Sequence, residues 1–233
     1  MGTPVLLPIA SGFYLSDSLP VSAQECVNYY PSIPQAPALS EGTLRGGHGI
    51  EQIATTGELA QANRGAHVKA GIPYFVNGDN LYRLNLSVDG EGVETFTLTQ
   101  LGAVGGDGRV SMADNGTQLM ILIPGGNGYI YNEADVGNEF QQITDGDFIA
   151  NGAPDHVVFV DGYFAVTTQS KKWIVSALND GLNWNALDFG TAEADPDDIV
   201  APLVFRNQVY IAGGQTTEPF QNIGGADFPF RRV

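Results

Sequence analysis

Histidine is the side chain in this sequence best suited to bind a transition metal or to carry a proton near neutral pH. The chain has three, His48, His67 and His156. Zinc and nucleophile sites need such residues at fixed spacings, as in H-E-x-x-H, C-x-x-C and G-x-S-x-G, and the sequence contains none of these motifs. We place His67 and His156 at the same position of two repeats, interpret them as polar residues at strand edges, and predict no catalytic residues.

Two glycine-rich segments could be taken for phosphate-binding loops. They are Gly106-Asp107-Gly108 and Gly126-Asn127-Gly128. A nucleotide loop of this kind has a third glycine and opens a helix, and neither segment meets these conditions. We predict that both are hairpin turns and that the chain has no cofactor-binding site.

An acidic segment and a pair of lysines are the remaining candidates for ion binding. Glu193 and Asp195-Pro196-Asp197-Asp198 could supply carboxylate ligands to calcium, but Val200 stands where an EF-hand loop needs glycine. We interpret the segment as an exposed acidic loop and predict no metal site. Lys171-Lys172, next to Trp173, could contact a phosphate or an acidic group of a partner, although paired lysines in a hairpin are usually only solvated.

Composition argues against tight nucleic-acid binding, a disulfide framework and a membrane span. Ten Lys and Arg residues oppose 26 Asp and Glu residues, a formal net charge of −16, whereas nucleic-acid affinity comes largely from basic side chains. The single cysteine, Cys26, excludes an intrachain disulfide. The longest strongly apolar run, Leu119 to Ile123, is far shorter than the ~20 residues of a membrane-spanning helix.

Turn signals recur at a regular interval along the chain. Apolar stretches flank turns near residues 71, 115, 161 and 206, which are 44 to 46 residues apart. Asn-Gly and Asp-Gly pairs between apolar stretches are strong hairpin signals. The first strand of each unit is predicted near residues 67–71, 109–113, 156–160 and 202–205, and two further apolar stretches follow each hairpin.

Four short antiparallel strands in about 45 residues are typical of a β-propeller blade. We therefore predict an all-β fold, a β-propeller over residues 65–233 with about four blades, the last incomplete. A β-sandwich with coincidental spacing is the alternative, although sandwich turns recur without such a long period. Because residues 65–233 hold fewer than four full repeats of 45, we expect the chain to be a portion of a larger propeller.

The first 64 residues differ from the rest of the chain. They hold six of the 13 prolines, which are spaced so that neither helix interiors nor central strands are favoured. We predict an extended Pro- and Gly-rich segment over residues 1–64, with one short strand near residues 13–15. A helix over residues 51–62 is an open alternative.

One segment resembles the Asp-box turn of sialidase-type propellers. Within Ala177–Trp184, Gly181 and Trp184 match the pattern S-x-D-x-G-x-T-W, while Asn179 and Asn183 stand in for its Asp and Thr. In that resemblance the box is a turn between the third and fourth strands of a blade, so it supports the fold more than an activity. A glycosidase also needs two carboxylates at a defined separation, and no such pair stands out.

Short motifs follow one another in a definite order from residue 25 to residue 232. They are Glu25-Cys26-Val27-Asn28-Tyr29-Tyr30-Pro31, Leu44-Arg45-Gly46-Gly47-His48-Gly49-Ile50, Asn63-Arg64-Gly65, Asn80-Leu81-Tyr82-Arg83-Leu84, Gly108-Arg109-Val110-Ser111-Met112-Ala113, Asp161-Gly162-Tyr163-Phe164, Leu187-Asp188-Phe189, Pro196-Asp197-Asp198-Ile199, Thr216-Thr217-Glu218 and Phe228-Pro229-Phe230-Arg231. In order and spacing they resemble the phage stabilisation family, the packaged-DNA stabilisation or tail accessory proteins of short-tailed phages. Members of that family continue beyond the last motif, so the chain resembles their N-terminal portion.

The resemblance implies a structural protein of the virion tail, present in the host cytoplasm during assembly. Copies of it are expected to form a ring, a hexamer, below the portal and its adaptor and in contact with other tail proteins. This hub or nozzle extends the portal channel and helps retain packaged DNA until ejection, while DNA passes nearby without tight binding. No catalytic residue or cofactor comes with the resemblance, so we predict that the chain is not an enzyme.

Two other functions stay open at the level of the sequence. A carbohydrate-binding or glycosidase-type propeller is suggested by the Asp-box-like turn and by Trp173, Trp184 and Tyr163 as candidate exposed aromatic residues. A propeller that binds proteins requires only the fold. Converging acids and arginines in a central pocket would favour an enzyme, whereas acids scattered on outer loops would favour a structural protein.

Overall fold

The computed structural model describes residues 28–32, 43–56, 61–192, 198–225 and 228–233. The chain divides into two compact units, Met1–Ile53 and Ala54–Val233. In the first unit, β1 (Tyr29–Ser32) and β2 (Thr43–Gly46) form an antiparallel pair. The strand expected near residues 13–15 lies outside the described residues. The open alternative of a helix over residues 51–62 is wrong for the described part of that stretch, which contains no helix.

The described part of the second unit contains four antiparallel sheets of four strands, and each sheet uses consecutive strands. We call them blades 1 to 4. The blades comprise β3 (Asn63–Lys69), β4 (Ile72–Asn77), β5 (Asn80–Val88) and β6 (Glu94–Ala103); β7 (Ser111–Asp114), β8 (Gln118–Leu122), β9 (Gly128–Asn132) and β10 (Phe140–Gln142); β11 (Pro154–Val160), β12 (Tyr163–Thr168), β13 (Lys172–Ala177) and β14 (Asp180–Thr191); and β15 (Ile199–Phe205), β16 (Gln208–Gly213), β17 (Thr217–Asn222) and β18 (Phe230–Arg232). One short helix, α1 (Gly146–Ile149), precedes blade 3 in the described chain.

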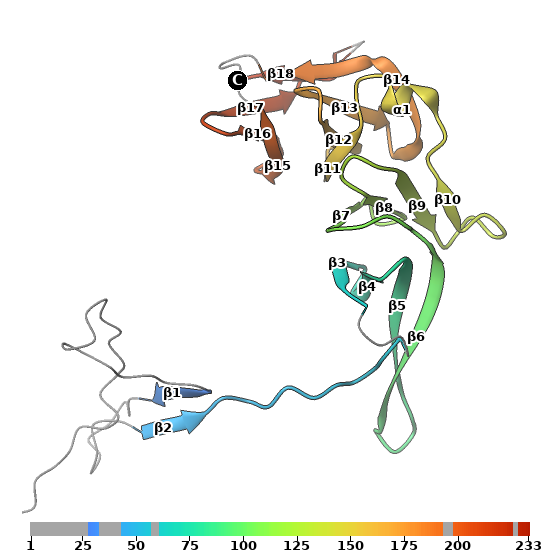
Figure 1. Cartoon of the computed structure of the whole chain (residues 1–233), viewed down its shortest axis with the longest axis vertical. Coiled ribbons are helices and arrows are strands. Elements are labelled where there is room, and N and C mark those ends of the chain that lie inside the picture. The colour runs from blue at the N-terminus through green and yellow to red at the C-terminus, as the bar shows by residue number, and fades with distance from the viewer. Residues whose placement is uncertain (1–27, 33–42, 57–60, 193–197, 226–227) are drawn as a thin grey trace, which may run out of the picture. The chain divides into compact units, whose positions relative to one another are not determined.

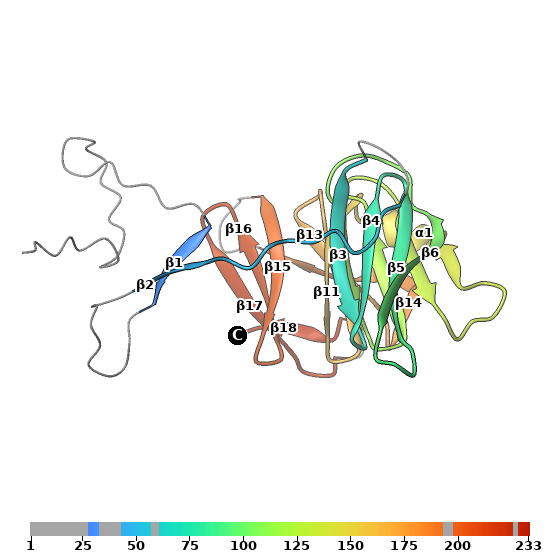
Figure 2. The ribbon, with the colours of Figure 1, turned by 90° about the horizontal axis from the view of Figure 1, so that it is seen from below.

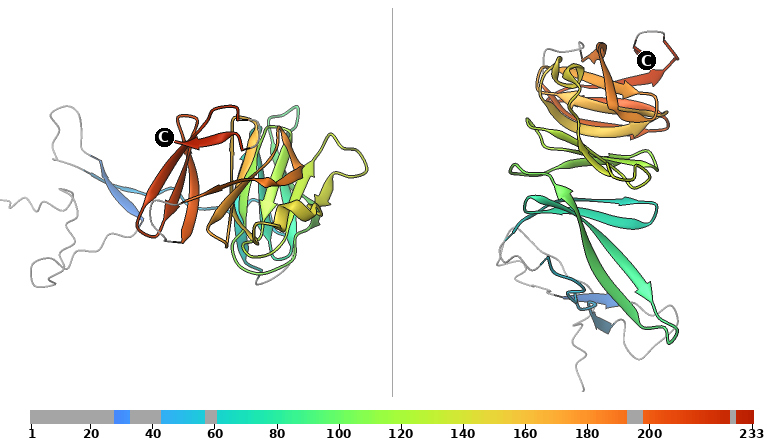
Figure 3. Two further views of the ribbon diagram at one scale, coloured as in Figure 1. Left: turned by 90° about the horizontal axis from the view of Figure 1, so that it is seen from above. Right: turned by 90° about the vertical axis from the view of Figure 1, so that its right-hand side faces the viewer.

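The all-β propeller architecture predicted from the 44- to 46-residue spacing is confirmed. The four predicted first strands correspond to β3, β7, β11 and β15, and the first strands of successive blades contact one another. Figure 1 shows the blades following one another along an open arc, with these first strands on its inner side. Figures 2 and 3 show the same blades as successive layers, so the β-sandwich alternative is wrong.

Left-handed residues form the first turn in three of the four described blades. The two-residue turns Ala70-Gly71, Asp161-Gly162 and Arg206-Asn207 have positive φ at both positions, between 49° and 88°. Positive φ at both central residues defines the type I′ turn, whose twist matches that of the flanking strands. Each of these turns therefore joins the first two strands of a blade with the same geometry.

Hydrophobic clusters between adjacent blades form the core of the described second unit. Strand β8 is buried at all five positions because alternate side chains enter different clusters, Leu119 and Ile121 towards blade 1 and Met120 and Leu122 towards blade 3. The third cluster joins blades 3 and 4 and includes Trp173. Inner blades are thus covered on both faces, which is why their strands read as nearly continuous apolar runs.

Trp173 is the largest side chain of the third cluster and is 0% exposed. Its ring lies 4.9–5.4 Å from the rings of Phe220, Phe228 and Phe230. We expect Trp173→Ala to lower the free energy of unfolding by about 3–5 kcal/mol, because it removes this packing and leaves a cavity.

The measurement is urea unfolding followed by circular dichroism. Leu187→Ala is the control, since Leu187 lies in the same blade and is 75% exposed. It is expected to stay within about 0.5 kcal/mol of the wild type. Equal effects of the two substitutions would contradict the assignment of the core.

Candidate functional site

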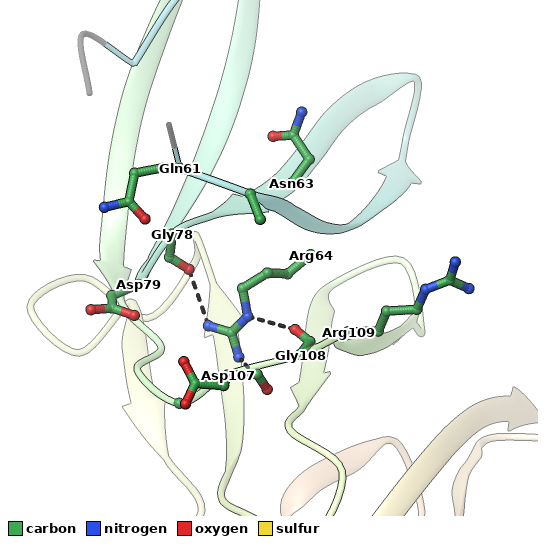
Figure 4. A pocket seen from close by; sticks show the side chains of 10 residues that line it. Gln61, Asn63, Arg64, Gly78, Asp79, Asp107, Gly108 and Arg109 are labelled. Carbon is green, nitrogen blue, oxygen red and sulfur yellow. Dashed lines mark hydrogen bonds between the residues drawn. The ribbon is translucent and has the colours of Figure 1, made fainter. Parts of the chain in front are cut away.

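A pocket of about 320 Å³ lies where blade 1 meets the connection to blade 2. It opens beside the start of β3, the β4–β5 turn and the segment that links β6 to β7 (Figure 4). Its lining residues are Gln61, Ala62, Asn63, Arg64, Gly78, Asp79, Gly106, Asp107, Gly108 and Arg109. Their charged members are two arginines and two aspartates, so the formal charges of the lining cancel.

Arg64 is the buried centre of this pocket, with 7% of its surface exposed. Its Nε donates to the Gly108 carbonyl at 2.7 Å, and its Nη1 donates to the Gly78 and Gly105 carbonyls at 3.0 and 2.6 Å. Nη2 lies 3.4 Å from the Asp107 carbonyl. The guanidinium is therefore surrounded by main-chain oxygens contributed by blade 1 and by the connection to blade 2.

Glycine conformation makes this arrangement possible. Gly105, Gly106 and Gly108 all have positive φ, between 64° and 76°, and so turn several carbonyls of a short segment towards one point. The main chain adds a direct link, because the Val110 N–H donates to the Arg64 carbonyl at 2.9 Å. The expectation that Gly106-Asp107-Gly108 is a hairpin turn is wrong: it belongs to the blade-to-blade connection, since β6 ends at Ala103 and β7 begins at Ser111.

The pocket is better suited to holding two blades together than to catalysis. Its lining has no histidine, cysteine or serine that could serve as base or nucleophile. The Arg64 guanidinium donates its hydrogen bonds to main-chain carbonyls. Figure 4 shows the Arg109 side chain pointing away from this guanidinium. Sequence reasoning missed Arg64 as a structural residue, although Asn63-Arg64-Gly65 stood among the family motifs.

The predicted polar histidines serve different local roles. His67 Nε2 lies 2.5 Å from Asp114 Oδ2 and joins β3 to β7. His156 Nδ1 lies 3.2 Å from Asp155, its neighbour on β11. The prediction that His67 and His156 share one repeat position is wrong: counted from the turns, His67 is matched by Val158, and His156 lies in an irregular part of the β11 ladder.

Lys69 is a second buried cation between blades 1 and 2. Its Nζ donates to the Thr117 carbonyl at 2.9 Å and lies 5.7 Å from the ring centres of both Tyr74 and Tyr131. Burial raises the pKa of both tyrosines, which are therefore neutral at pH 7. Lys69 thus rests between two neutral rings and helps to align the blades.

The Asp-box-like segment is a turn between β13 and β14, but its acidic residue is Asp180, one position after Asn179. Asp180 Oδ1 accepts a hydrogen bond from the Leu182 N–H at 3.0 Å, and Gln118 of blade 2 donates to the same oxygen at 3.3 Å. The Asn183 side chain also donates to Asp180. The segment therefore ties blade 3 to blade 2, as expected for a packing device.

Burial alone would raise the pKa of Asp180, but the hydrogen bonds from Leu182, Asn183 and Gln118 outweigh it and lower the pKa below its usual value. The ionised carboxylate is the form that these donors favour. Asp180 thus contributes to stability as an anion and not as an acid catalyst.

The aromatic residues proposed for carbohydrate contact are mostly buried. Trp173 and Trp184 belong to the clusters between blades, and the Trp184 Nε1–H donates to the Gly181 carbonyl at 2.9 Å. Tyr163 is half-buried and packs edge-on against Phe230. The expectation that both tryptophans are exposed is wrong, and the carbohydrate alternative loses the surface on which it depended.

Most of the acidic segment, residues 193–197, lies outside the described residues. Asp198 is described and pairs with Lys171 at 3.2 Å. Across the described parts of the chain, no group of three or more His, Cys, Asp or Glu residues is arranged to hold a metal ion. No helix in those parts is long and apolar enough to cross a membrane.

Comparisons with known proteins connect this architecture to a family. A family model described as Bacteriophage P22 Gp10, beta-propeller, matches residues 5–233. The comparison with curated proteins gives no match. Similar solved structures include BamB from Moraxella catarrhalis (12% identity, TM-score 0.45, 69% of this chain and 44% of that chain) and the glutaminyl cyclase of Myxococcus xanthus (11% identity, TM-score 0.39, 68% and 64%). The chain thus spans less than two thirds of either solved protein.

Substitution of Arg64 tests the assignment of the pocket as a structural link. We expect Arg64→Met to lower the free energy of unfolding by about 3 kcal/mol, because several buried carbonyls lose charged donors. Arg64→Lys is expected to lose about half as much, since an ammonium cannot reproduce the planar set of donors.

Arg109→Met is the matched control for both variants. Arg109 lines the same pocket but is exposed. The control is expected within about 0.5 kcal/mol of the wild type in chemical unfolding. If Arg64→Met were as stable as Arg109→Met, the proposed link would be refuted.

The lowered pKa of Asp180 gives a pH-dependent prediction. A carboxyl with a lowered folded-state pKa stabilises the fold above its unfolded pKa of about 3.9 and loses this contribution as pH falls through the folded value. We expect Asp180→Asn to cost about 1 kcal/mol at pH 7 and at pH 5, through the lost charged hydrogen bonds.

Below pH 4 the difference between wild type and Asp180→Asn should shrink. Urea unfolding at each pH measures it, with Asp107→Asn as the control because Asp107 is exposed and its carboxylate accepts none of the hydrogen bonds described above. A cost of Asp180→Asn that stays constant down to pH 3 would show that ionisation of this group is unimportant.

Proposed function

The chain belongs to the phage stabilisation family of bacteriophage structural proteins, and from this premise we propose that it serves in the virion as a tail hub or nozzle. In this role it extends the portal channel and helps to retain packaged DNA until ejection. The family match over residues 5–233 is the observation that carries the proposal. As a structural component it has no enzymatic activity.

The use of its polar residues supports a scaffold role. Arg64, Lys69 and Asp180 are each held by hydrogen bonds that connect one blade to the next or to its connecting segment. Side chains of these types would form the core of an active site if they converged on a common cavity. Here their hydrogen bonds lie at the junctions between blades. This arrangement favours a role as a rigid structural element of an assembly.

The lysines support passage of DNA without adhesion. Lys69 is buried against Thr117, and Lys171 is paired with Asp198. Lys172 donates to Asn151 Oδ1 at 3.0 Å and lies 4.1 Å above the Phe189 ring. All three lysines of a chain with net charge −16 are thus engaged within the protein, and phosphate binding would have to disrupt those contacts.

The proposed partners follow from this role. Copies of the protein form a ring, for which we propose six subunits, below the portal adaptor and beside other tail proteins. The acidic surface is suited to meet basic patches on those neighbours, since charge complementarity steers association. Assembly takes place in the host cytoplasm before the protein becomes part of the virion.

Two experiments, one on the isolated protein and one on phage particles, test whether the protein retains packaged DNA without binding it tightly. The isolated protein should show no duplex DNA binding by fluorescence anisotropy near physiological salt, because its net charge of −16 disfavours a polyanion. Particles made without it should package DNA and then lose it, which nuclease sensitivity of the genome over time would measure.

Supplying the protein in trans should restore retention, and it serves as the control for secondary effects of the deletion. Stable filled particles without the protein would refute the role in retention. Salt-dependent duplex binding at micromolar concentration would refute passage without adhesion.

A further inference from the structure

The sequence contains four Asn-Gly pairs, at residues 77–78, 115–116, 127–128 and 151–152. Asparagine is a chemically labile residue, most of all before glycine, which has no side chain to shield the following main-chain nitrogen from the asparagine side chain. A folded structure slows this chemistry where hydrogen bonds and burial hold the asparagine side chain in place. Because the four pairs share the same dipeptide, the structure around each one decides which of them reacts.

Asn77 and Asn151 are held in the interior, where they are 9% and 7% exposed. The Asn77 side-chain oxygen accepts a hydrogen bond from the Thr56 hydroxyl at 2.9 Å. The Asn151 side chain donates to the Ala186 carbonyl at 2.7 Å and accepts from Lys172 Nζ at 3.0 Å. Both side chains must break these bonds and leave the interior before they can react.

Asn115 is half-buried, in the turn between β7 and β8, and its side chain is also held. Its Oδ1 accepts hydrogen bonds from the Thr117 and Gln118 N–H groups at 3.0 and 2.6 Å. Its Nδ2 donates to the Asn179 carbonyl of blade 3 at 3.2 Å. This pair is therefore protected by hydrogen bonds and not by burial.

Asn127 differs from the other three asparagines. It is exposed in the turn between β8 and β9, and its side chain makes no hydrogen bond to any residue in the part of the chain that the structure describes. Its main-chain carbonyl still accepts from the Ile123 N–H at 3.0 Å, so the turn is formed while the side chain is free. Gly125 and Gly126 precede it, and Gly128 is the first residue of β9, where strand hydrogen bonds open most readily.

We propose that Asn127 is a site of spontaneous deamidation, at which the side-chain amide is exchanged for a carboxylate with water as the co-reactant. The Gly128 nitrogen forms a bond to Asn127 Cγ, the bond from Cγ to Nδ2 breaks, and the proton of the Gly128 nitrogen leaves with the departing ammonia. Water then opens the resulting cyclic imide at either carbonyl carbon, which gives aspartate or isoaspartate. The proposal does not depend on the role in a phage tail.

The isoaspartate product disturbs the core beside the turn. A Cβ atom at residue 128 would lie 2.9 Å from side-chain atoms of Ile143, Leu122 and Phe148. All three side chains belong to the cluster between blades 2 and 3, so the main chain of Gly128 already lies against closely packed atoms. Isoaspartate adds one methylene group to the main chain directly before this residue, whereas aspartate leaves the main chain unchanged. We therefore expect only the isoaspartate product to loosen the junction.

Peptide mapping of aged protein by mass spectrometry tests the site. The folded protein is kept in mildly alkaline buffer, where the attacking nitrogen loses its proton more readily, and is sampled over time. Asn127 should deamidate at least about tenfold faster than Asn77, Asn115 and Asn151, because each of those must first open hydrogen bonds. Protein unfolded in guanidinium chloride is the control, in which the four pairs should react at similar rates. Folded protein in which Asn127 reacts no faster than Asn115 would overturn the proposal, as would a ranking that unfolding leaves unchanged.

Urea unfolding separates the two products. Asn127→Asp has the charge of the deamidated protein with an unaltered main chain, and it should unfold at the same urea concentration as the wild type. Wild-type protein aged until it contains isoaspartate at residue 127, identified by peptide elution against synthetic standards, should unfold at a lower concentration. Asn127→Gln, whose longer side chain slows ring closure, should keep its stability through the same ageing. Equal midpoints for the aged protein and Asn127→Asp, or an equal loss in aged Asn127→Gln, would overturn the effect on the junction.

Discussion

Burial of a sheet on both of its faces is the constraint on which this structure depends. A four-stranded sheet with apolar side chains on both sides cannot stand alone in water, and each inner blade satisfies this need through its two neighbours. In β8 all five residues are buried, with successive side chains entering different clusters. Each blade therefore has its own ladder of main-chain hydrogen bonds between strands, but the blades depend on one another for the packing of their faces.

Polar side chains fix the relative orientation of neighbouring blades, which apolar packing alone does not determine. Apolar contacts are not directional, so they hold two sheets together without fixing their angle. Arg64, Lys69 and Asp180 add directional bonds between neighbouring blades or their connections. The hydrogen bonds that Arg64 and Lys69 make at the junctions explain why these two charged side chains are buried.

Local turn chemistry explains how much of the fold was predictable from sequence. Asp161-Gly162 marks a turn because Asp tolerates and Gly readily adopts positive φ, and in Arg206-Asn207 the asparagine tolerates it. The apolar runs beside these pairs identify the strands. Interactions between distant segments could not be read in this way. Gly106-Asp107-Gly108 has the composition of a hairpin but forms a connection between blades, and its partner Arg64 lies over 40 residues away in sequence. Trp173 and Trp184 were placed on the surface because the clusters that bury them come from different blades.

The use of consecutive strands in every blade has a consequence for biosynthesis. Contacts within a blade join residues close in sequence, so loop-closure entropy is small and a blade can form as soon as its strands have left the ribosome. Its forward face then stays exposed until the next blade emerges to cover it. During synthesis, each newly formed blade thus packs against the blade that formed before it. The exposed apolar face of the most recent blade is the surface that a chaperone would have to protect.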